Sequence, residues 1–343
     1  MKPDSLPRHR RQFIKEVGVA TAGVMLHQTL PAETDSASGG KSETKSGEVP
    51  RRRLGRTGEM LSIMGIGGHT LALAPNEEES LRIVHEAIEG GINFMDNAWE
   101  YHEGRSEIVM GKALKGWRDR VFLMTKCCAH KRGQTKKAAL EMLDESLTRL
   151  QTDRLDLWML HQLTTMDEVQ AAFTTDGPLE GLLAAKKQGK VRYLGFTGHQ
   201  SAEVHLAMLN HGFPFDAVLM PVNAFEPNRK GFRTEVLPVL QKRELGVLGI
   251  KSLGGTPARV LRDGKYTAQQ LLRFSLSHPI TTQIVGMSSL QNLRDNLEIA
   301  RNFTPMRPAE MEKLVAQLST DNNAQGFARY HLPGYRDGHG VVA

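Results

Sequence analysis

Residues 91–114, GINFMDNAWEYHEGRSEIVMGKAL, begin with a short apolar run at 92–96 that has the composition of a buried β-strand and ends on an acid. Similar runs recur along the chain. The eight candidate strands span 61–66, 92–96, 121–126, 155–161, 191–197, 217–221, 246–251 and 282–286. The stretches between them, such as 77–91 and 135–150, carry apolar residues at the spacing of an amphipathic helix. The pattern predicts parallel strands joined by helices.

Eight strand–helix units in about 250 residues predict a closed (β/α)8 TIM barrel of the α/β class, because an open doubly wound sheet usually needs fewer strands. The 343 residues, 40% of them hydrophobic, suffice for one large core. Gly65-Ile66-Gly67-Gly68 is not a dinucleotide fingerprint, since Thr70 stands where the third glycine belongs. We expect these glycines to let a ligand approach the backbone at the barrel mouth.

Residues 1–32 have the three-part layout of an export signal: a basic start, a mildly apolar run from Val17, and small residues near a cleavage site at Ala32. Residues 10–15, RRQFIK, are similar to a twin-arginine motif. This signal would engage the twin-arginine export machinery, which carries folded proteins, and would place the protein in the periplasm. The alternative is an amphipathic helix with a basic start. The apolar run is too short for a stable membrane span, and residues 33–50 are expected to be a polar linker.

Charge and cysteine content exclude several other classes. The formal charge is +6, but residues 1–32 hold five Lys/Arg against two Asp/Glu, which leaves +3 for the remainder. No basic cluster interleaved with aromatic residues occurs, so no nucleic acid partner is expected. Cys127 and Cys128 are adjacent, which allows neither a disulfide framework nor a spaced zinc cluster. We expect Cys127 and Cys128 to be two small residues of the barrel wall; the alternative is a strained disulfide between these neighbours.

Four polar residues follow the predicted strands where the chemistry of such barrels takes place: Asp96, Lys126 and His161 end strands two, three and four, and Tyr101 lies just beyond Asp96. A carbonyl that accepts hydride develops negative charge on oxygen and needs a proton. Tyr101 is the candidate acid, and Lys126 would lower its pKa while Asp96 keeps the lysine charged. His161 would orient the substrate oxygen as a neutral donor. Each residue alone has an ordinary structural explanation, but the set of four favours the chemical one.

The segments that hold these four residues resemble the aldo-keto reductase family. The segment 91–114 is similar to the one that holds the family's catalytic Asp and Tyr, while 123–126 (LMTK) and 156–161 (DLWMLH) are similar to those that hold its Lys and His. Residues 52–68 resemble its N-terminal hairpin and first strand. The resemblance covers 51–303 and implies an oxidoreductase that transfers hydride between a nicotinamide cofactor and a carbonyl or alcohol substrate (aldehyde, ketone or sugar), with Tyr101 as the general acid.

The resemblance also implies sites for the cofactor, either NADP(H) or NAD(H). The positions concerned are Gly67, Thr197, Gly198, Asn223, Lys251, Ser252, Ser288, Ser289, Asn292 and Asn296. Thr197-Gly198 replaces the family's Ser-Asn after strand five. Met220 stands where the family has a Gln on strand six, and Asn223 could take the role of that Gln. Lys251 stands where an aromatic residue usually stacks on nicotinamide. The start of the last barrel helix suits a phosphate, although the basic residue expected at 287 or 288 is missing.

Two other functions also fit the sequence. The first is a metal-dependent hydrolase, because His69, His161 and His199 fall near strand ends, where Cys127 or Cys128 could join them. The second is a non-catalytic barrel that uses bound nucleotide as a structural or sensing element. Residues 304–343 read as a further helix and an irregular tail, either a disordered terminus or a flap over the mouth. An aromatic and histidine rim of Trp99, His102, His130 and Trp158 would suit sugars or small aldehydes.

Overall fold

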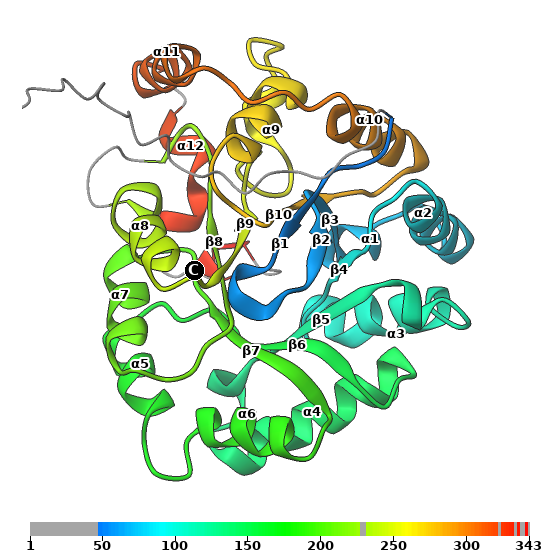
Figure 1. Ribbon diagram of the computed structural model, residues 1–343, viewed down its shortest axis with the longest axis vertical. Helices are drawn as coiled ribbons and strands as arrows, with labels where there is room; N and C mark the ends of the chain where they lie inside the picture. Colours follow the sequence, from blue (N-terminus) through cyan, green and yellow to red (C-terminus); the bar gives the residue numbers. More distant parts are fainter. Residues whose placement is uncertain (1–46, 227–230, 322–323, 333–334, 337–339, 342–343) are drawn as a thin grey trace, which may run out of the picture. The chain divides into compact units, whose positions relative to one another are not determined.

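A computed structural model describes residues 47–226, 231–321, 324–332, 335–336 and 340–341. The predicted signal (1–32) and most of the predicted linker lie outside these residues. Eight parallel strands form a closed barrel in sequence order, and the last strand pairs with the first (Figure 1). The strands are β3 (Met64–Gly67), β4 (Phe94–Asp96), β5 (Phe122–Cys127), β6 (Leu155–Leu160), β7 (Val191–Thr197), β8 (Ala217–Pro221), β9 (Gly246–Ile250) and β10 (Thr282–Gly286). The predicted (β/α)8 fold is confirmed.

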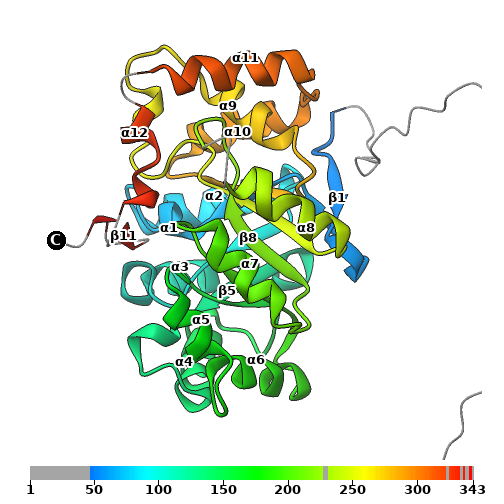
Figure 2. The same ribbon diagram turned by 90° about the vertical axis from the view of Figure 1, so that its left-hand side faces the viewer.

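The first predicted strand, 61–66, is wrong as a single element. It divides into β2 (Met60–Ser62), which pairs antiparallel with β1 (Arg51–Arg53), and the barrel strand β3. Polar contacts at Ser62 account for the break: its backbone N–H donates to the Asn93 side chain at 2.7 Å, and its hydroxyl donates to the Met64 carbonyl at 2.7 Å. The β1–β2 hairpin covers the N-terminal face of the barrel (Figure 2), where the Thr281 hydroxyl donates to the Arg53 carbonyl at 3.1 Å.

An outer ring of helices surrounds the barrel (Figure 1). Serine and threonine caps define several helix starts, for example Thr135 before α4 and Ser289 before α10. The ring helices are α2 (Glu77–Glu89), α3 (Arg105–Ala113), α4 (Lys136–Leu150), α6 (Pro178–Lys187), α7 (Ala202–Asn210), α8 (Leu237–Lys242), α9 (Ala268–Leu276) and α10 (Leu290–Arg301). Short helical elements in the loops are α1 (Gly68–Leu71), α5 (Met166–Ala172), η1 (Gly55–Thr57), η2 (Tyr101–Gly104), η3 (Arg118–Arg120), η4 (Ala129–Lys131), η5 (Phe232–Val236) and η6 (Arg259–Leu261).

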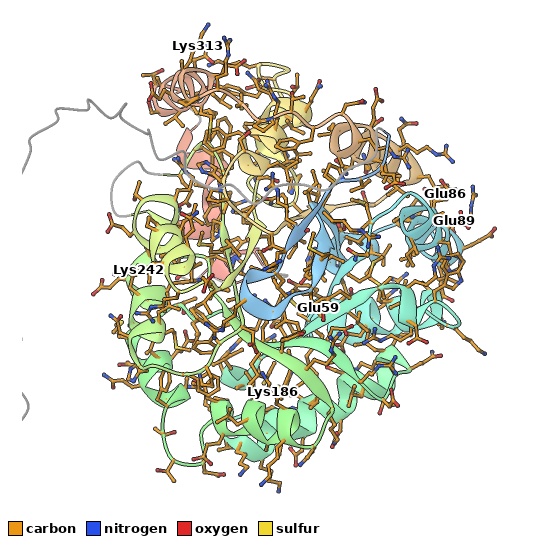
Figure 3. All side chains as sticks on the ribbon, viewed as in Figure 1. Glu59, Glu86, Glu89, Lys186, Lys242 and Lys313 are labelled. Atoms are coloured by element: carbon orange, nitrogen blue, oxygen red, sulfur yellow. The ribbon has the colours of Figure 1, made fainter. Side chains whose placement is uncertain are left out.

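Among the residues described, apolar side chains form three clusters, one of which includes Phe274, Leu314 and Phe327. The barrel interior holds residues such as Phe94, Met124 and Leu157, and Leu54 and Leu61 of the hairpin region join this cluster. A larger cluster packs between the strands and the helices. Charged side chains project from the outer surface, as Lys186, Lys242 and Lys313 show in Figure 3. In the described part of the chain, no helix has the length and apolarity to cross a membrane.

The C-terminal segment returns to the barrel mouth. It contains α11 (Pro308–Ser319), α12 (Ala324–Phe327), η7 (Arg329–His331) and the antiparallel pair β11 (Tyr335–Arg336) and β12 (Gly340–Val341). Glu226, which follows β8, anchors this segment because its Oε1 accepts hydrogen bonds from the Tyr330 hydroxyl at 2.8 Å and from His331 Nε2 at 2.7 Å. The segment lies opposite the hairpin (Figure 2). Residues far apart in sequence therefore meet at the mouth.

Candidate active site

Asp96, Tyr101 and Lys126 form one hydrogen-bonded cluster at the mouth. Asp96 ends β4 and Lys126 lies near the end of the adjacent strand β5, so the sheet places them side by side. Lys126 Nζ donates to Asp96 Oδ1 at 2.5 Å, to the Asn97 carbonyl at 2.6 Å and to the Tyr101 hydroxyl at 3.1 Å. The Lys126 and Asp96 side chains are 1% and 2% exposed, so their pairing is shielded from water. A buried ammonium thus contacts the candidate acid directly.

A tight loop fixes the Tyr101 ring. His102 and Glu103, which follow it, have φ of 50° and 57°, in the left-handed region that non-glycine residues rarely adopt. The ring centroid of Tyr101 lies 5.4 Å from that of His69 and 5.7 Å from that of His161, both in edge-on orientation. His161 follows β6, so three consecutive strands and one loop bring the four predicted catalytic residues together.

His161 also contacts Glu100, which the sequence analysis missed, and Cys128, which it considered only as a metal ligand. Its Nδ1 lies 3.1 Å from Glu100 Oε1 and 3.2 Å from Cys128 Sγ. Glu100 further accepts from Gln162 Nε2 at 3.0 Å and pairs with Lys131 Nζ at 2.6 Å. Burial by itself would raise the pKa of Glu100, but hydrogen bonds and charges from His161 and Lys131 hold it well below its usual range. The signal in the sequence was an acid directly before Tyr101.

The histidines of the metal hypothesis do not gather into one set. Among the described residues, the metal-type ligands whose atoms lie within 4.8 Å of one another are Glu100, Cys128 and His161, without His69 or His199. Lys131 already balances the carboxylate, and burial raises the pKa of the Cys128 thiol well above its usual value. These features favour a hydrogen-bonded cluster of Glu100, Cys128 and His161 over a metal site. Cys127 and Cys128 are both free thiols in the buried wall, as the favoured prediction had it.

A cavity of about 520 Å³ opens beside this cluster and includes Asp96 and Tyr101 in its wall. The loops after β9 and β10 and the C-terminal segment line the rest. Three cationic side chains face it, those of Lys251, Arg259 and Arg329. Of the predicted cofactor residues, four line the cavity: Gly67, Lys251, Ser252 and Ser288. Trp99, His102, His130 and Trp158 are not part of this wall, and Trp158 is fully buried in the core.

The other six predicted cofactor residues are not among those that line the cavity, and most have structural contacts. Thr197 Oγ1 accepts from the Gln162 backbone N–H at 3.1 Å, and Asn223 Nδ2 donates to the Lys251 carbonyl at 3.1 Å. A Cβ added to Gly198 would lie 2.5 Å from the Leu163 carbonyl oxygen. The remaining three belong to α10: Ser289 caps it by accepting from Asn292 N, and Asn296 is buried within it.

Lys251 occupies the position where the family resemblance led us to expect an aromatic residue. Its φ is 62°, and its Nζ lies 3.1 Å from the hydroxyl of Tyr335 in β11. Both residues line the cavity. The C-terminal segment therefore supplies an aromatic ring to this wall, which agrees with the flap alternative for residues 304–343. The sequence did not indicate which residues of the segment reach the cavity.

The fold and the mouth geometry agree with the comparison to known proteins. The aldo/keto reductase family model matches residues 63–267, and the chain belongs to this family. It is an NAD(P)-dependent oxidoreductase. Relatives include the uncharacterized oxidoreductase YqkF of Bacillus subtilis, which is 25% identical over 79% of this chain and 97% of its own length. The L-galactose dehydrogenase of Arabidopsis thaliana is 27% identical over 73% and 88%.

Solved structures agree in fold. An aldo-keto reductase from Bacillus halodurans in its holo form has a TM-score of 0.63 and 26% identity, covering 78% of this chain and 95% of its own. An aldo/keto reductase from Klebsiella pneumoniae in complex with NADP and acetate has a TM-score of 0.64 and 22% identity, covering 81% and 97%.

Proposed function

We propose that this chain reduces the carbonyl group of a small aldehyde, ketone or sugar with NADPH or NADH, and catalyses the reverse oxidation. The observation that carries the proposal is the contact of Lys126 Nζ with both Asp96 and the Tyr101 hydroxyl, in the wall of a cavity. Relatives with oxidoreductase names and the sugar substrate in the name of L-galactose dehydrogenase support this choice.

The residues around the cavity fit a nicotinamide dinucleotide, which supplies or accepts the hydride when bound. Gly286 and Thr70 both line the cavity, and a Cβ at 286 would lie 2.9 Å from Thr70 Cγ2, so a side chain at 286 would crowd this wall. Ser288 stands just before α10, whose own first turn carries no acid, so the positive end of the helix dipole favours an anion there. The Glu79 carboxylate accepts from the Leu290 N–H at 3.3 Å, and a phosphate at this helix start would compete with it. Lys251, Arg259 and Arg329 add positive charge for a diphosphate.

The chain's own residues handle the proton. Tyr101 donates its hydroxyl proton to the carbonyl oxygen as negative charge develops there. The Lys126 ammonium, 3.1 Å away, stabilises the phenolate that remains, and Asp96 holds that ammonium in position. The burial of this pair strengthens both interactions because little water screens them. His161, whose ring lies edge-on to that of Tyr101, is the candidate donor that orients the substrate oxygen.

Titration of the purified protein with NADPH and NADH, followed by nucleotide fluorescence, tests the cofactor. Mass spectrometry of nucleotide that co-purifies complements it. The matched variant is Tyr101→Phe, which should lower kcat about 10²- to 10⁴-fold while nucleotide affinity stays within twofold of the unsubstituted protein, about the limit of the assay. Undiminished turnover would refute the role of Tyr101, whereas tight binding without any carbonyl reduction would favour the non-catalytic nucleotide-binding barrel.

We further propose that residues 1–32 direct export to the periplasm through the twin-arginine machinery, with 33–50 as linker and 51–303 as the barrel. Support comes from the sequence alone, since the signal lies outside the described residues. Replacement of Arg10 and Arg11 by Lys, which keeps the charge, should retain the protein in the cytoplasm, as cell fractionation would show. Unchanged export would contradict the proposal.

A further inference from the structure

Glu100 is a buried acid at the site to which the proposed reaction gives no role. Its side chain is 2% exposed, and it directly precedes Tyr101. Its carboxylate contacts His161 and Gln162 in the loop after β6 and Lys131 in the loop after β5. Burial of a charged group is costly unless it is paired and hydrogen-bonded. The hydrogen bonds and the ion pair therefore indicate that the Glu100 carboxylate is charged where it contacts His161.

The contact decides which ring nitrogen of His161 carries a proton. Nδ1 lies 3.1 Å from Glu100 Oε1, and a bare Nδ1 would direct its lone pair at a negative oxygen. A proton on Nδ1 turns this repulsion into a charge-assisted hydrogen bond. Cys128 Sγ, 3.2 Å from the same nitrogen, is a weaker partner because the buried thiol stays neutral. Glu100 therefore outweighs Cys128, and the proton belongs on Nδ1.

This placement changes the form in which His161 can assist the reaction. A neutral ring with its proton on Nδ1 has only a lone pair at Nε2, which cannot donate to a carbonyl oxygen. We propose that Glu100 is a positioning residue that keeps a proton on His161 Nδ1, so that His161 donates from Nε2 to the substrate oxygen as an imidazolium. This inference rests on the proposed carbonyl reduction and replaces the neutral donor expected from the sequence.

The reaction balances with these roles. A bound reduced nicotinamide would supply the hydride to the carbonyl carbon and would itself be oxidised. The C=O π electrons move to oxygen, and the Tyr101 hydroxyl proton goes to that oxygen to give the alcohol. The imidazolium keeps its proton and stabilises the developing charge. Tyr101 recovers a proton from water. A cation at His161 is most useful in the transition state, when the oxygen carries negative charge.

The charged groups around His161 act in opposite directions. Glu100 favours the imidazolium, and Lys131 opposes it both directly and by neutralising Glu100. Other titratable neighbours include Cys128, Tyr101 and, beyond the tyrosine, the Lys126–Asp96 pair and His69. Glu100 and Lys131 therefore offer a matched pair of substitutions with opposite expected effects.

Nitrogen NMR of the full, ¹⁵N-labelled chain tests the proton placement without any turnover. A His161→Gln variant identifies the ring signals of His161. We expect Nδ1 to stay protonated from about pH 5 to pH 9, and the imidazolium to persist to a higher pH than in a free histidine. In Glu100→Gln the imidazolium should be lost about one to three pH units lower, and in Lys131→Met at a higher pH than in the unsubstituted protein.

Carbonyl reduction should follow the same shifts. Its rate should fall as pH rises and His161 loses its proton, and this fall should move down in Glu100→Gln and up in Lys131→Met, with Glu100→Asp close to the unsubstituted protein. A bare Nδ1 in the NMR spectrum, or shifts in the same direction for both variants, would overturn the inference. The NMR result stands even if no carbonyl is reduced, so failure of the proposed function is distinguishable. Lys131 is 34% exposed, so its variant provides the test if Glu100→Gln does not fold.

Discussion

Lys126→Met tests the buried charge pair through stability. Met matches the aliphatic part of lysine but removes Nζ, which leaves the Asp96 carboxylate, 2% exposed, without its cation. Removing one partner of a buried ion pair costs about 3–5 kcal/mol. The Asn97 carbonyl also loses a donor at 2.6 Å. We therefore expect the free energy of unfolding to fall by at least about 3 kcal/mol, measured by urea unfolding near pH 7.

The double variant Asp96→Leu/Lys126→Met separates the charge effect from packing. Leu has the same shape and number of side-chain heavy atoms as Asp, so the pair becomes apolar without a large change in volume. Such replacements are often neutral or stabilising. The double variant should regain most of the lost stability while carbonyl reduction stays abolished. A Lys126→Met protein as stable as the unsubstituted one, or a double variant no more stable than the single, would refute the reasoning.

Three further predictions concern packing, acid stability and the cofactor. Gly198→Ala should lower the free energy of unfolding by about 1–3 kcal/mol, because the new Cβ would lie 2.5 Å from a carbonyl oxygen; unchanged stability in a urea titration would contradict this. Burial lowers the pKa of His205 from 6.5 to about 4. Its unfolded form therefore binds a proton that the folded form does not, so stability is complete above pH 6.5 and falls toward pH 4. The expected loss is about 2 kcal/mol at pH 5 relative to pH 7, and His205→Leu should remove this part of the difference. Arg329→Ala should weaken NADPH binding about 10- to 100-fold in a fluorescence titration, whereas Arg307→Ala, outside the cavity wall, should leave it unchanged.

The catalytic candidates were predictable because the strand pattern alone places them. Asp96, Lys126 and His161 end consecutive strands, and parallel strands bring their C-terminal ends to one face of a barrel. Tyr101 follows within the same loop. Neighbouring strands need no information beyond their order, so the sequence was sufficient for this cluster.

Contacts that depend on loop conformation were not predictable in the same way. Glu100, in the loop after β4, meets His161, in the loop after β6, although 60 residues lie between them in sequence. Gly198 stands where the family has a different cofactor residue, and a Cβ there would meet the Leu163 carbonyl oxygen. Asn223 was a possible substitute for a missing Gln, yet its amide donates to the Lys251 carbonyl. Tyr330 meets Glu226 across 104 residues, and no local pattern decides between the disordered tail and the flap over the mouth that the sequence left open. The break at Ser62 depends on Asn93, 31 residues away.

The hairpin and the C-terminal strands lie on opposite faces of the barrel, and this has a practical consequence for anyone who attaches the protein to a surface. An affinity tag or reporter joined ahead of residue 47 is tethered at the N-terminal face of the barrel, which the hairpin covers. The mouth can then point toward solution. A tag joined beyond residue 341 is tethered next to Tyr335, in the wall of the cavity. Immobilised binding assays with small ligands should therefore use the N-terminal side.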